Sequence, residues 1–400
     1  MTILAIDAGT TGVTALLVSH EAKVVARGYT EFPQHFPADG WVEHDPNEIW
    51  AATLSSLDQV LKSPAINEHG APTAVGITDQ RETIVLWDRE TLGSARMAIV
   101  WQDRRTAGFC DQLKADGHEA RVAELTGLRL DPYFSATKLS WIAKQEPHVW
   151  AGVKEGRTAI GTIDSYLIAR MTRGVTHVTD ASNASRTLLF DIHSGEWSQE
   201  LCDLFGVPID ALPEVVPSYG QVGMTDPSVF GGLEIPIAGI AGDQQAALFG
   251  QACFEVGSSK CTYGTGSFVL VNTGDKIVRS DAGLLSTVAW KHPVGTLTYA
   301  LEGAIFVTGS AVQWLRDGLG LIENASETED LANSVPNSAG VVFVPALTGL
   351  GAPDWDPNAR GAIFGLTRGA TRAHVVRATL EAIAFEVRDV VDVMVNEADV

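Results

Sequence analysis

The sequence predicts an α/β protein of two domains that share one duplicated plan. Two Gly/Thr-rich turns, at residues 7–12 and 264–267, each lie between apolar runs and are about 255 residues apart. Short β-branched runs and amphipathic helical segments then alternate after the first of these hairpins. Because each hairpin would open one domain, we expect an N-terminal domain over 1–250 and a C-terminal domain over 251–400.

Each domain is expected to begin with antiparallel strands. In the first domain, apolar runs at 3–6 and 13–18 flank a turn, and the segment 23–28 follows after a polar bend, which is typical of a β-meander. In the second domain, residues 260–263 and 268–271 flank the Gly/Thr turn in the same way.

A helix is expected to follow the first meander. Asp45 has the chemistry of a cap, Pro46 suits the first helical position, and Glu48 stands three residues after the cap. Further short strands are expected at 74–78, 83–87 and 98–101, and a long, largely buried helix at 371–395. The apolar face of the capped helix would consist of Trp50, Leu54, Leu57 and Leu61.

Composition restricts the classes of partner. The chain of 400 residues is 45% hydrophobic and 19% charged, which indicates a globular protein, and its net charge of −21 disfavours nucleic acid and anionic membrane surfaces. No apolar run approaches a membrane span and no signal peptide is recognisable, so we expect a cytoplasmic protein. The four cysteines lack the spacing of a zinc site or disulfide framework. The oligomeric state, a homo-oligomer included, stays open.

The two Gly/Thr turns are candidates for phosphate binding. Tight turns rich in Gly expose consecutive backbone N–H groups, and Thr adds hydroxyl donors. Asp7 at the strand end could hold Mg²⁺ through water. The alternative is that each turn is an ordinary hairpin turn, which is the commoner case for a single Gly-Thr turn. No Gly-Lys dipeptide and no Gly-x-Gly-x-x-Gly pattern occurs, so P-loop and dinucleotide folds lack their main signatures.

Several further side chains are candidates for a site. Arg81 and Glu82 lie between two predicted strands, where an adjacent pair of opposite charges is normally a solvated turn. Trp101 and Tyr133 are, by themselves, more often core or turn aromatics. Asp243 interrupts a small, apolar stretch and is a candidate general base, although structural Asp residues at strand ends are also common.

Taken together and in this order, these residues resemble the glycerol kinases, members of the FGGY carbohydrate kinase family. The resemblance runs through nearly the whole chain, and the combination of Arg81, Glu82, Trp101 and Tyr133 favours glycerol over a longer sugar. Two stretches, 133–145 and 361–381, look like general signatures of the family. The other matching stretches are 40–46, 80–83, 100–106, 131–135, 179–187, 239–250, 263–266 and 343–369.

The resemblance implies a duplicated actin-like, ribonuclease-H-like fold with ATP and glycerol in an interdomain cleft. It also implies a role for each matching residue. Asp243 would act as general base, and Asp7 with Asp243 would hold Mg²⁺. The substrate-binding residues would be Arg81, Glu82, Trp101, Tyr133, Asp243, Gln244 and Phe268. The nucleotide-binding residues for ATP or ADP would be Asp7, Gly9, Thr10, Thr11, Gly264, Thr265, Gly309 and Gln313.

Three departures from the family pattern bear on these expectations. Thr14 stands where glycerol kinases usually have an Arg that contacts the nucleotide phosphates. Glu234 stands where regulated bacterial members carry an Arg for a phosphorylated inhibitor. Family members also continue for about another hundred residues beyond the position of Val400, so we expect a weak adenosine site. The alternatives are a kinase of another small polyol or sugar, and a non-catalytic binding protein on this scaffold.

Overall fold

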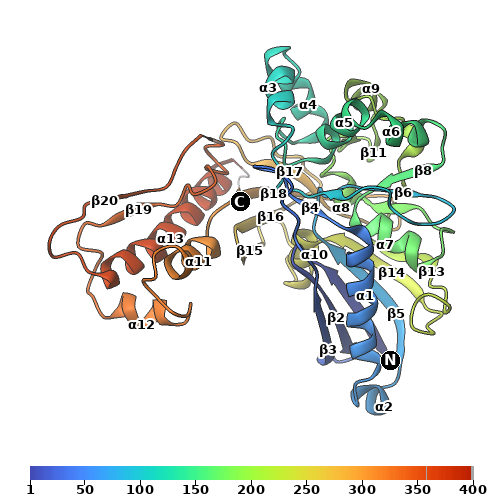
Figure 1. Cartoon of the computed structure of the whole chain (residues 1–400), viewed down its shortest axis with the longest axis horizontal. Coiled ribbons are helices and arrows are strands. Elements are labelled where there is room, and N and C mark those ends of the chain that lie inside the picture. Colours follow the sequence, from blue (N-terminus) through green and yellow to red (C-terminus); the bar gives the residue numbers. More distant parts are fainter. Residues whose placement is uncertain (357, 398–400) are drawn as a thin grey trace. The chain divides into compact units, whose positions relative to one another are not determined.

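The computed structural model describes residues 1–356 and 358–397, and their contacts divide the chain into two compact units (Figure 1). Unit 1 comprises Met1–Ala246 and Thr287–Thr298, and unit 2 comprises Ala247–Ser286 and Tyr299–Val400. Both units mix helices and strands, as the sequence predicts.

A six-stranded sheet forms the centre of unit 1. β1 to β3 form the expected antiparallel meander, and β5 and β14 extend the sheet parallel to β1. Across the sheet the strands follow the order β13 (Tyr219–Met224), β14 (Pro236–Gly242), β5 (Pro72–Asp79), β1 (Thr2–Ala8), β2 (Gly12–Ser19) and β3 (Val24–Glu31).

The three parallel strands of this sheet end at one edge. In the register of the ladders, Asp79 of β5 stands opposite Ala8 of β1 on one side and Gly242 of β14 on the other. Ligands of open α/β sheets bind beyond the carboxyl ends of such strands. This edge is therefore the place in unit 1 where a site is expected.

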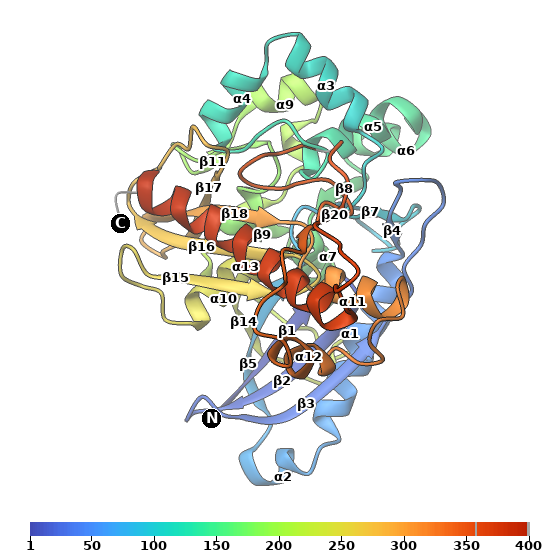
Figure 2. The same cartoon turned by 90° about the vertical axis from the view of Figure 1, so that its left-hand side faces the viewer.

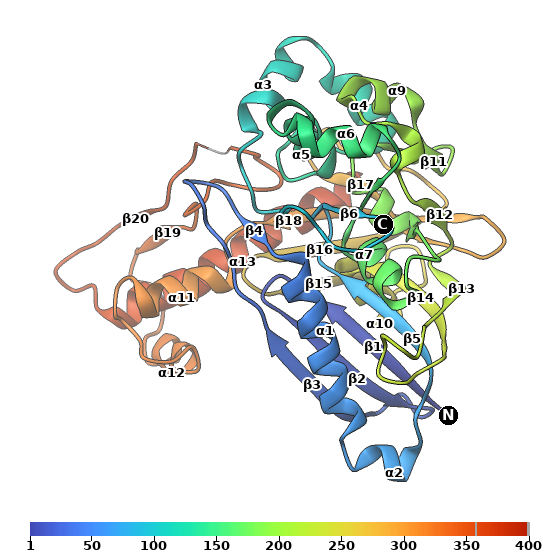
Figure 3. The ribbon, with the colours of Figure 1, turned by 45° about the vertical axis from the view of Figure 1, so that its right-hand side comes forward.

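Helix α1 (Pro46–Leu61) packs on β2 and β3 (Figure 3). The predicted cap is confirmed, because the Asp45 side chain accepts a hydrogen bond from the Asn47 backbone N–H and Pro46 occupies the first turn. The buried face of α1 is rotated relative to the predicted apolar face. Ile49 and Val60 are fully buried, whereas the predicted Leu54 and Leu61 are only partly buried.

The other helices and short strands of unit 1 lie between β3 and β13, within residues 32–218. Its short strands are β4 (Glu43–His44), β6 (Val85–Asp88), β7 (Ala98–Ile99), β8 (Thr158–Gly161), β9 (Val178–Asp180), β10 (Phe190–Asp191), β11 (Glu196–Trp197) and β12 (Glu214–Val216). Its helices are α2 (Ala65–His69), α3 (Ala107–Ala115), α4 (Glu119–Thr126), α5 (Ser135–Gln145), α6 (Pro147–Lys154), α7 (Ile163–Met171), α8 (Ala181–Ala184), α9 (Gln199–Phe205) and the 3-10 turn Ile209–Ala211.

One strand prediction needs correction. The expected strand over 98–101 is only β7, Ala98–Ile99, and Trp101 lies in the turn that follows. The Asp103 side chain accepts a hydrogen bond from the Val42 backbone N–H at 2.7 Å, so the chain turns against the neighbouring segment instead of extending β7.

A second sheet has four strands in the order β15-β16-β18-β17, of which β15, β16 and most of β18 belong to unit 2. β15 (Ser259–Tyr263) and β16 (Ser267–Gly274) form the predicted second hairpin, with Tyr263 opposite Ser267 across the turn. β16 pairs next with β18 (Leu297–Ile305), and β17 (Leu285–Lys291) lies outside it, so this sheet is not a simple meander. Residues Thr287–Thr298 group with unit 1.

The long helix α13 (Arg372–Glu397) lies along the sheet of unit 2 (Figure 2). Val390 and Met394 pack with Leu301 and Ile305, and a Cβ atom at Gly303 would lie 2.3 Å from Val390 Cγ1. The expectation of a largely buried helix is wrong, because Phe385 on its other side is 57% exposed. Unit 2 also contains α10 (Asp243–Gly250, which begins in unit 1), α11 (Gly309–Asp317), α12 (Glu327–Asn333), β19 (Val342–Val344) and β20 (Ala362–Phe364). Among the described residues, no helix meets the length and apolarity needed to cross a membrane.

Candidate active site

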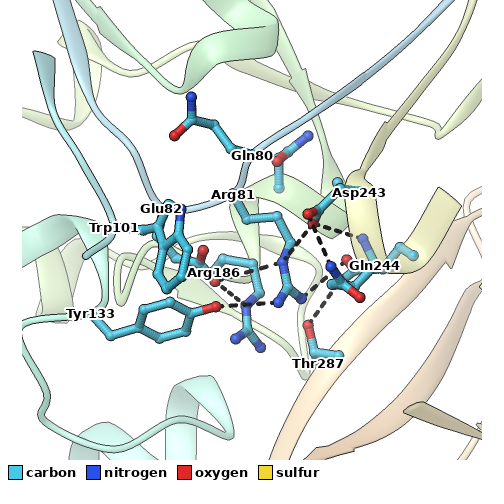
Figure 4. Close-up of polar contacts among 12 residues, drawn as sticks. Gln80, Arg81, Glu82, Trp101, Tyr133, Arg186, Asp243, Gln244 and Thr287 are labelled. Carbon is cyan, nitrogen blue, oxygen red and sulfur yellow. Dashed lines mark hydrogen bonds and ion pairs between the residues drawn. The ribbon is translucent and has the colours of Figure 1, made fainter. Parts of the chain in front are cut away.

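Polar side chains gather beyond the carboxyl ends of β1, β5 and β14 in unit 1. Asp7 is next to last in β1, Arg81 and Glu82 follow β5, and Asp243 follows β14 at the start of α10. Figure 4 shows Arg81, Glu82 and Asp243 together with the aromatic side chains of Trp101 and Tyr133 and the amide of Gln244.

Arg81 is the hub of this group. Its Nε lies 3.3 Å from Asp243 Oδ1 and 3.8 Å from Glu82 Oε1. Arg81 and Glu82 are 2% and 1% exposed, so the solvated turn that the sequence alone favours is wrong. A buried guanidinium is costly unless it is paired and hydrogen-bonded, and here two carboxylates supply the pairing.

An aromatic wall borders the guanidinium. The Arg81 NH2 group donates to the Tyr133 hydroxyl at 3.3 Å, and the rings of Trp101 and Tyr133 meet edge to face at 5.6 Å. Trp101 Nε1 donates to Thr10 Oγ1 at 3.0 Å. The indole therefore connects the first Gly/Thr turn to the group around Arg81.

Glu82 is held by a second buried arginine. Arg186 Nε donates to Glu82 Oε1 at 2.7 Å, and its side chain is fully buried. Glu82 also has a positive φ of 61°, which only the surrounding contacts of a folded chain sustain in a non-glycine residue. Arg186 was not singled out from the sequence, since no local pattern distinguishes an arginine that follows a short helix.

Gln245 positions Arg81 from the other side. Its Oε1 accepts a hydrogen bond from Arg81 NH1 at 3.3 Å, and its Nε2 donates to Thr287 Oγ1 at 3.2 Å. Close packing against the backbone also holds the Arg81 side chain in position, because a Cβ at Gly242 would lie 2.7 Å from it. Gln245 was also missed, although it follows two predicted site residues directly.

Asp243 is the carboxylate beside Arg81 that remains accessible, with its side chain 38% exposed, whereas Glu82 is 1% exposed. The backbone N–H of Gln244 donates to Oδ1 at 2.7 Å and the Gln244 amide donates to Oδ2 at 3.0 Å. These contacts fix the orientation of the carboxylate while leaving it open to a ligand. This combination suits a general base.

Asp7 is a second carboxylate close to the first. Neighbouring protein removes much of its surrounding water and the charge of Asp243 opposes ionisation, so the pKa of Asp7 is raised to about 6, although its side chain still reaches solvent. Two carboxylates whose charges disfavour each other fit a divalent cation, and hard oxygen donors are those that Mg²⁺ prefers. Within the described residues, no group of three or more His, Cys, Asp or Glu side chains forms a metal cage.

The first Gly/Thr turn is braced by amide side chains. Gln80 Nε2 donates to the Gly9 carbonyl at 3.0 Å and Gln34 Nε2 donates to the Thr10 carbonyl at 2.8 Å. These bonds occupy carbonyl oxygens of the turn and hold its backbone in place. Thr11 at its tip is exposed.

The second Gly/Thr turn, in unit 2, is bound to the start of α11. The Gly309 N–H donates to the Gly264 carbonyl at 2.9 Å, and the N–H groups of Thr308 and Ser310 donate to the Thr265 carbonyl at 3.0 Å. A Cβ at Gly309 would lie 2.4 Å from Gly264 O, so this approach requires glycine. A cavity of about 220 Å³ beside it is lined by Gly309, Val312, Gln313, Arg316 and Ala325.

The predicted residues thus form two sets. In unit 1, contacts connect Thr10, Arg81, Glu82, Trp101, Tyr133, Asp243 and Gln244, with Asp7, Gly9 and Thr11 on the adjoining strand end and turn. In unit 2, Gly264, Thr265 and Gly309 meet, Gln313 lines the adjacent cavity, and Phe268 lies on β16 beyond the turn.

Comparison with known proteins yields a consistent set of relatives. Models of the N-terminal and C-terminal domains of the FGGY family of carbohydrate kinases match residues 2–250 and 259–400. The chain is 52% identical over 398 residues to a glycerol kinase of Halorhodospira halophila, which covers 100% of this chain and 78% of that protein. It is 51% identical to glycerol kinase 2 of Thermotoga maritima, covering 100% of this chain and 80% of that protein.

Solved structures give the same result for the fold. A Plasmodium falciparum glycerol kinase with ADP matches with a TM-score of 0.91 and 37% identity, covering 100% of this chain and 79% of that one. A xylulose kinase from Lactobacillus acidophilus matches with a TM-score of 0.86 at 23% identity, covering 98% of this chain and 78% of that one, which supports the shared fold alone. The predicted actin-like sugar kinase fold is confirmed, and the chain belongs to the FGGY family of carbohydrate kinases.

Proposed function

We propose that this chain catalyses the ATP-dependent phosphorylation of glycerol to sn-glycerol 3-phosphate. The observation that carries the proposal is the group of Arg81, Glu82, Tyr133 and Asp243 at one sheet edge, in a chain about half identical to proteins named glycerol kinase. A relative with ADP supports an adenine nucleotide as the second substrate.

In this proposal, the polar side chains around Arg81 form hydrogen bonds with the hydroxyl groups of glycerol. Arg81 and Tyr133 offer hydrogen-bond donors, and Glu82 offers a carboxylate, in a place where both charged side chains are almost fully buried. Gln244 adds an amide, and the Trp101 ring offers an apolar wall for the carbon chain. A three-carbon triol has little apolar surface, so selection must depend on polar partners that a wrong ligand would leave unpaired.

We assign the proton transfer to Asp243. Of the two carboxylates beside Arg81, Asp243 is the one that solvent reaches, and two hydrogen bonds from Gln244 fix its direction. Asp243 would accept the proton of a terminal hydroxyl as that oxygen attacks the γ-phosphate of ATP. The bond to the departing ADP breaks as the new phosphate ester forms.

We assign phosphate binding to the Gly/Thr turns. Gly9, Thr10 and Thr11 follow Asp7 in unit 1, and backbone and hydroxyl donors of this kind suit phosphate oxygens. Asp7 and Asp243 would hold Mg²⁺, which neutralises phosphate charge when bound. For Gly264, Thr265, Phe268, Gly309 and Gln313 in unit 2, the assignment rests on the resemblance to family positions.

A substrate panel tests the proposal and separates it from its alternatives. ATP turnover is measured with glycerol, erythritol, xylulose and gluconate, and glycerol should give the highest kcat/KM. A higher kcat/KM for another polyol or sugar would favour a different kinase of the same family. Binding of glycerol without turnover of any of the four would instead favour a non-catalytic binding protein.

A further inference from the structure

Lys138 is a fully buried lysine just inside the N-terminus of α5. Its Nζ donates to three consecutive backbone carbonyls of the preceding loop, those of Pro132 at 2.8 Å, Tyr133 at 2.6 Å and Phe134 at 2.9 Å. One ammonium group therefore binds three acceptors of this turn of backbone at once.

The position is unfavourable for a cation unless the charge is needed. The N-terminus of a helix carries partial positive charge, and burial removes the water that solvates an ammonium group. An ammonium group has three N–H donors, which matches three carbonyls, whereas a neutral amine has only two. The contacts at this site thus require the protonated form.

The loop that Lys138 holds carries a residue of the candidate site. Tyr133 is 2% exposed and its hydroxyl accepts from Arg81, while its backbone N–H donates to Asp131 Oδ1 at 2.8 Å. Asp131 in turn accepts from Arg104 at 2.8 Å. A shift of this loop would move the Tyr133 ring and, through it, Arg81.

We propose that Lys138 is a positioning residue whose ammonium group fixes the loop 132–134, so that Tyr133 stands ready to bind the polyol. This inference rests on the proposed function for its kinetic consequence. Its structural consequence, an ordered loop, does not depend on any activity. Lys138 touches no substrate in this account and acts only through the backbone that it binds.

The charge of Lys138 responds to its surroundings. Burial lowers the pKa of Lys138 to about 7, while Glu82 and the carboxylates of Asp103 and Asp131 oppose that change and Arg104 adds to it. Cys110 of α3 also faces this group, and burial raises the pKa of its thiol to about 12, so it stays neutral near pH 7. Loss of the Lys138 proton as the pH rises leaves one carbonyl without a donor.

Three variants test the inference. Lys138→Met removes the charge with a side chain of similar length, and Lys138→Arg keeps a charge at every accessible pH. Lys144→Met on the same helix is the matched control, because Lys144 is exposed. For each protein, KM for glycerol, KM for ATP and kcat are measured, and amide hydrogen exchange is followed in the peptide that contains residues 131–134.

We expect Lys138→Met to raise KM for glycerol at least about tenfold and KM for ATP less than about twofold, with several-fold faster exchange in the loop. Lys138→Arg should retain part of the affinity, and Lys144→Met should match the parent. A KM for glycerol and a loop exchange rate in Lys138→Met equal to those of Lys144→Met would overturn the inference.

The parent protein provides a test that needs no variant, in case Lys138→Met fails to fold. Between about pH 6 and 9, KM for glycerol and the loop exchange, corrected for the intrinsic rate, should both rise as Lys138 loses its proton. In Lys138→Arg this rise should be absent. An equal rise in both proteins, or none in the parent, would contradict the inference. If the parent shows no glycerol-dependent turnover, the proposed function fails while loop exchange still decides the role of Lys138.

Discussion

Replacing Asp243 by Asn removes the proposed general base with the smallest change of shape. The Asn carbonyl oxygen can still accept from the Gln244 backbone N–H, which donates to Asp243 at 2.7 Å. The bond from the Gln244 amide at 3.0 Å is lost, since an Asn amide nitrogen cannot accept it. Arg81 keeps Glu82 as a partner at 3.8 Å.

These contacts set the expected magnitudes. The substitution removes one hydrogen bond and the carboxylate charge 3.3 Å from Arg81 Nε. Because the Asp243 side chain is 38% exposed and Arg81 keeps Glu82, the cost should be about 1–2 kcal/mol of stability. A positioned general base contributes at least about a hundredfold in rate, which corresponds to about 2.7 kcal/mol of transition-state stabilisation. The effect on turnover should therefore exceed the effect on folding.

The assay is a coupled measurement of ADP release at saturating glycerol and ATP, together with thermal unfolding of the same samples. Asp203→Asn is the matched control, because Asp203 is an exposed residue of α9 whose side chain accepts a hydrogen bond from the nearby Gln199 amide and belongs to no part of the candidate site. We expect kcat of Asp243→Asn to fall at least about a hundredfold with little change in melting temperature. Turnover within about threefold of the parent would refute the assignment.

Three further substitutions probe the site from other sides. Arg81→Ala should raise KM for glycerol far more than KM for ATP, and equal effects in one grid of initial rates would place Arg81 in general structure or in the phosphate site. Gln245→Leu breaks the connection from Arg81 to Thr287 and should lower kcat/KM for glycerol about tenfold, the equivalent of one buried hydrogen bond of about 1.4 kcal/mol; an unchanged value would remove its positioning role. Thr14→Arg places a guanidinium on β2 opposite Asp7 and should strengthen ATP binding in calorimetric titration, whereas weaker binding than in the parent would count against the assigned phosphate turn.

Local sequence patterns were sufficient for the elements that depend on local chemistry. The Gly/Thr turns with their flanking apolar strands, and the Asp45–Pro46 start of α1, are present as predicted. Caps and hairpins are determined by neighbouring residues, so periodicity and turn chemistry suffice to find them. The position of Asp243 directly after an apolar strand was predictable for the same reason.

The buried ionic contacts depend on residues far apart in the chain. From the sequence, Arg81 and Glu82 are predicted to form a solvated turn. In the structure, other elements bring Arg186 to Glu82 and Gln245 to Arg81. No periodic signal marks a side chain whose partner is about a hundred residues away. The buried Lys138 is a different case, because its three acceptors lie only four to six residues before it in the chain. A lysine early in a helix is usually solvated, and only the fold of the loop reveals these acceptors.

The most direct test of the proposed activity compares ADP formation with and without glycerol, for the parent and for Asp243→Asn in parallel. The product is identified by phosphorus NMR as a phosphate monoester of glycerol. We expect the parent to form ADP and this ester in equal amounts only when glycerol is present, and Asp243→Asn to form both at least about a hundredfold more slowly. ADP formation that does not depend on glycerol, or no ester from a folded parent protein, would contradict the proposal.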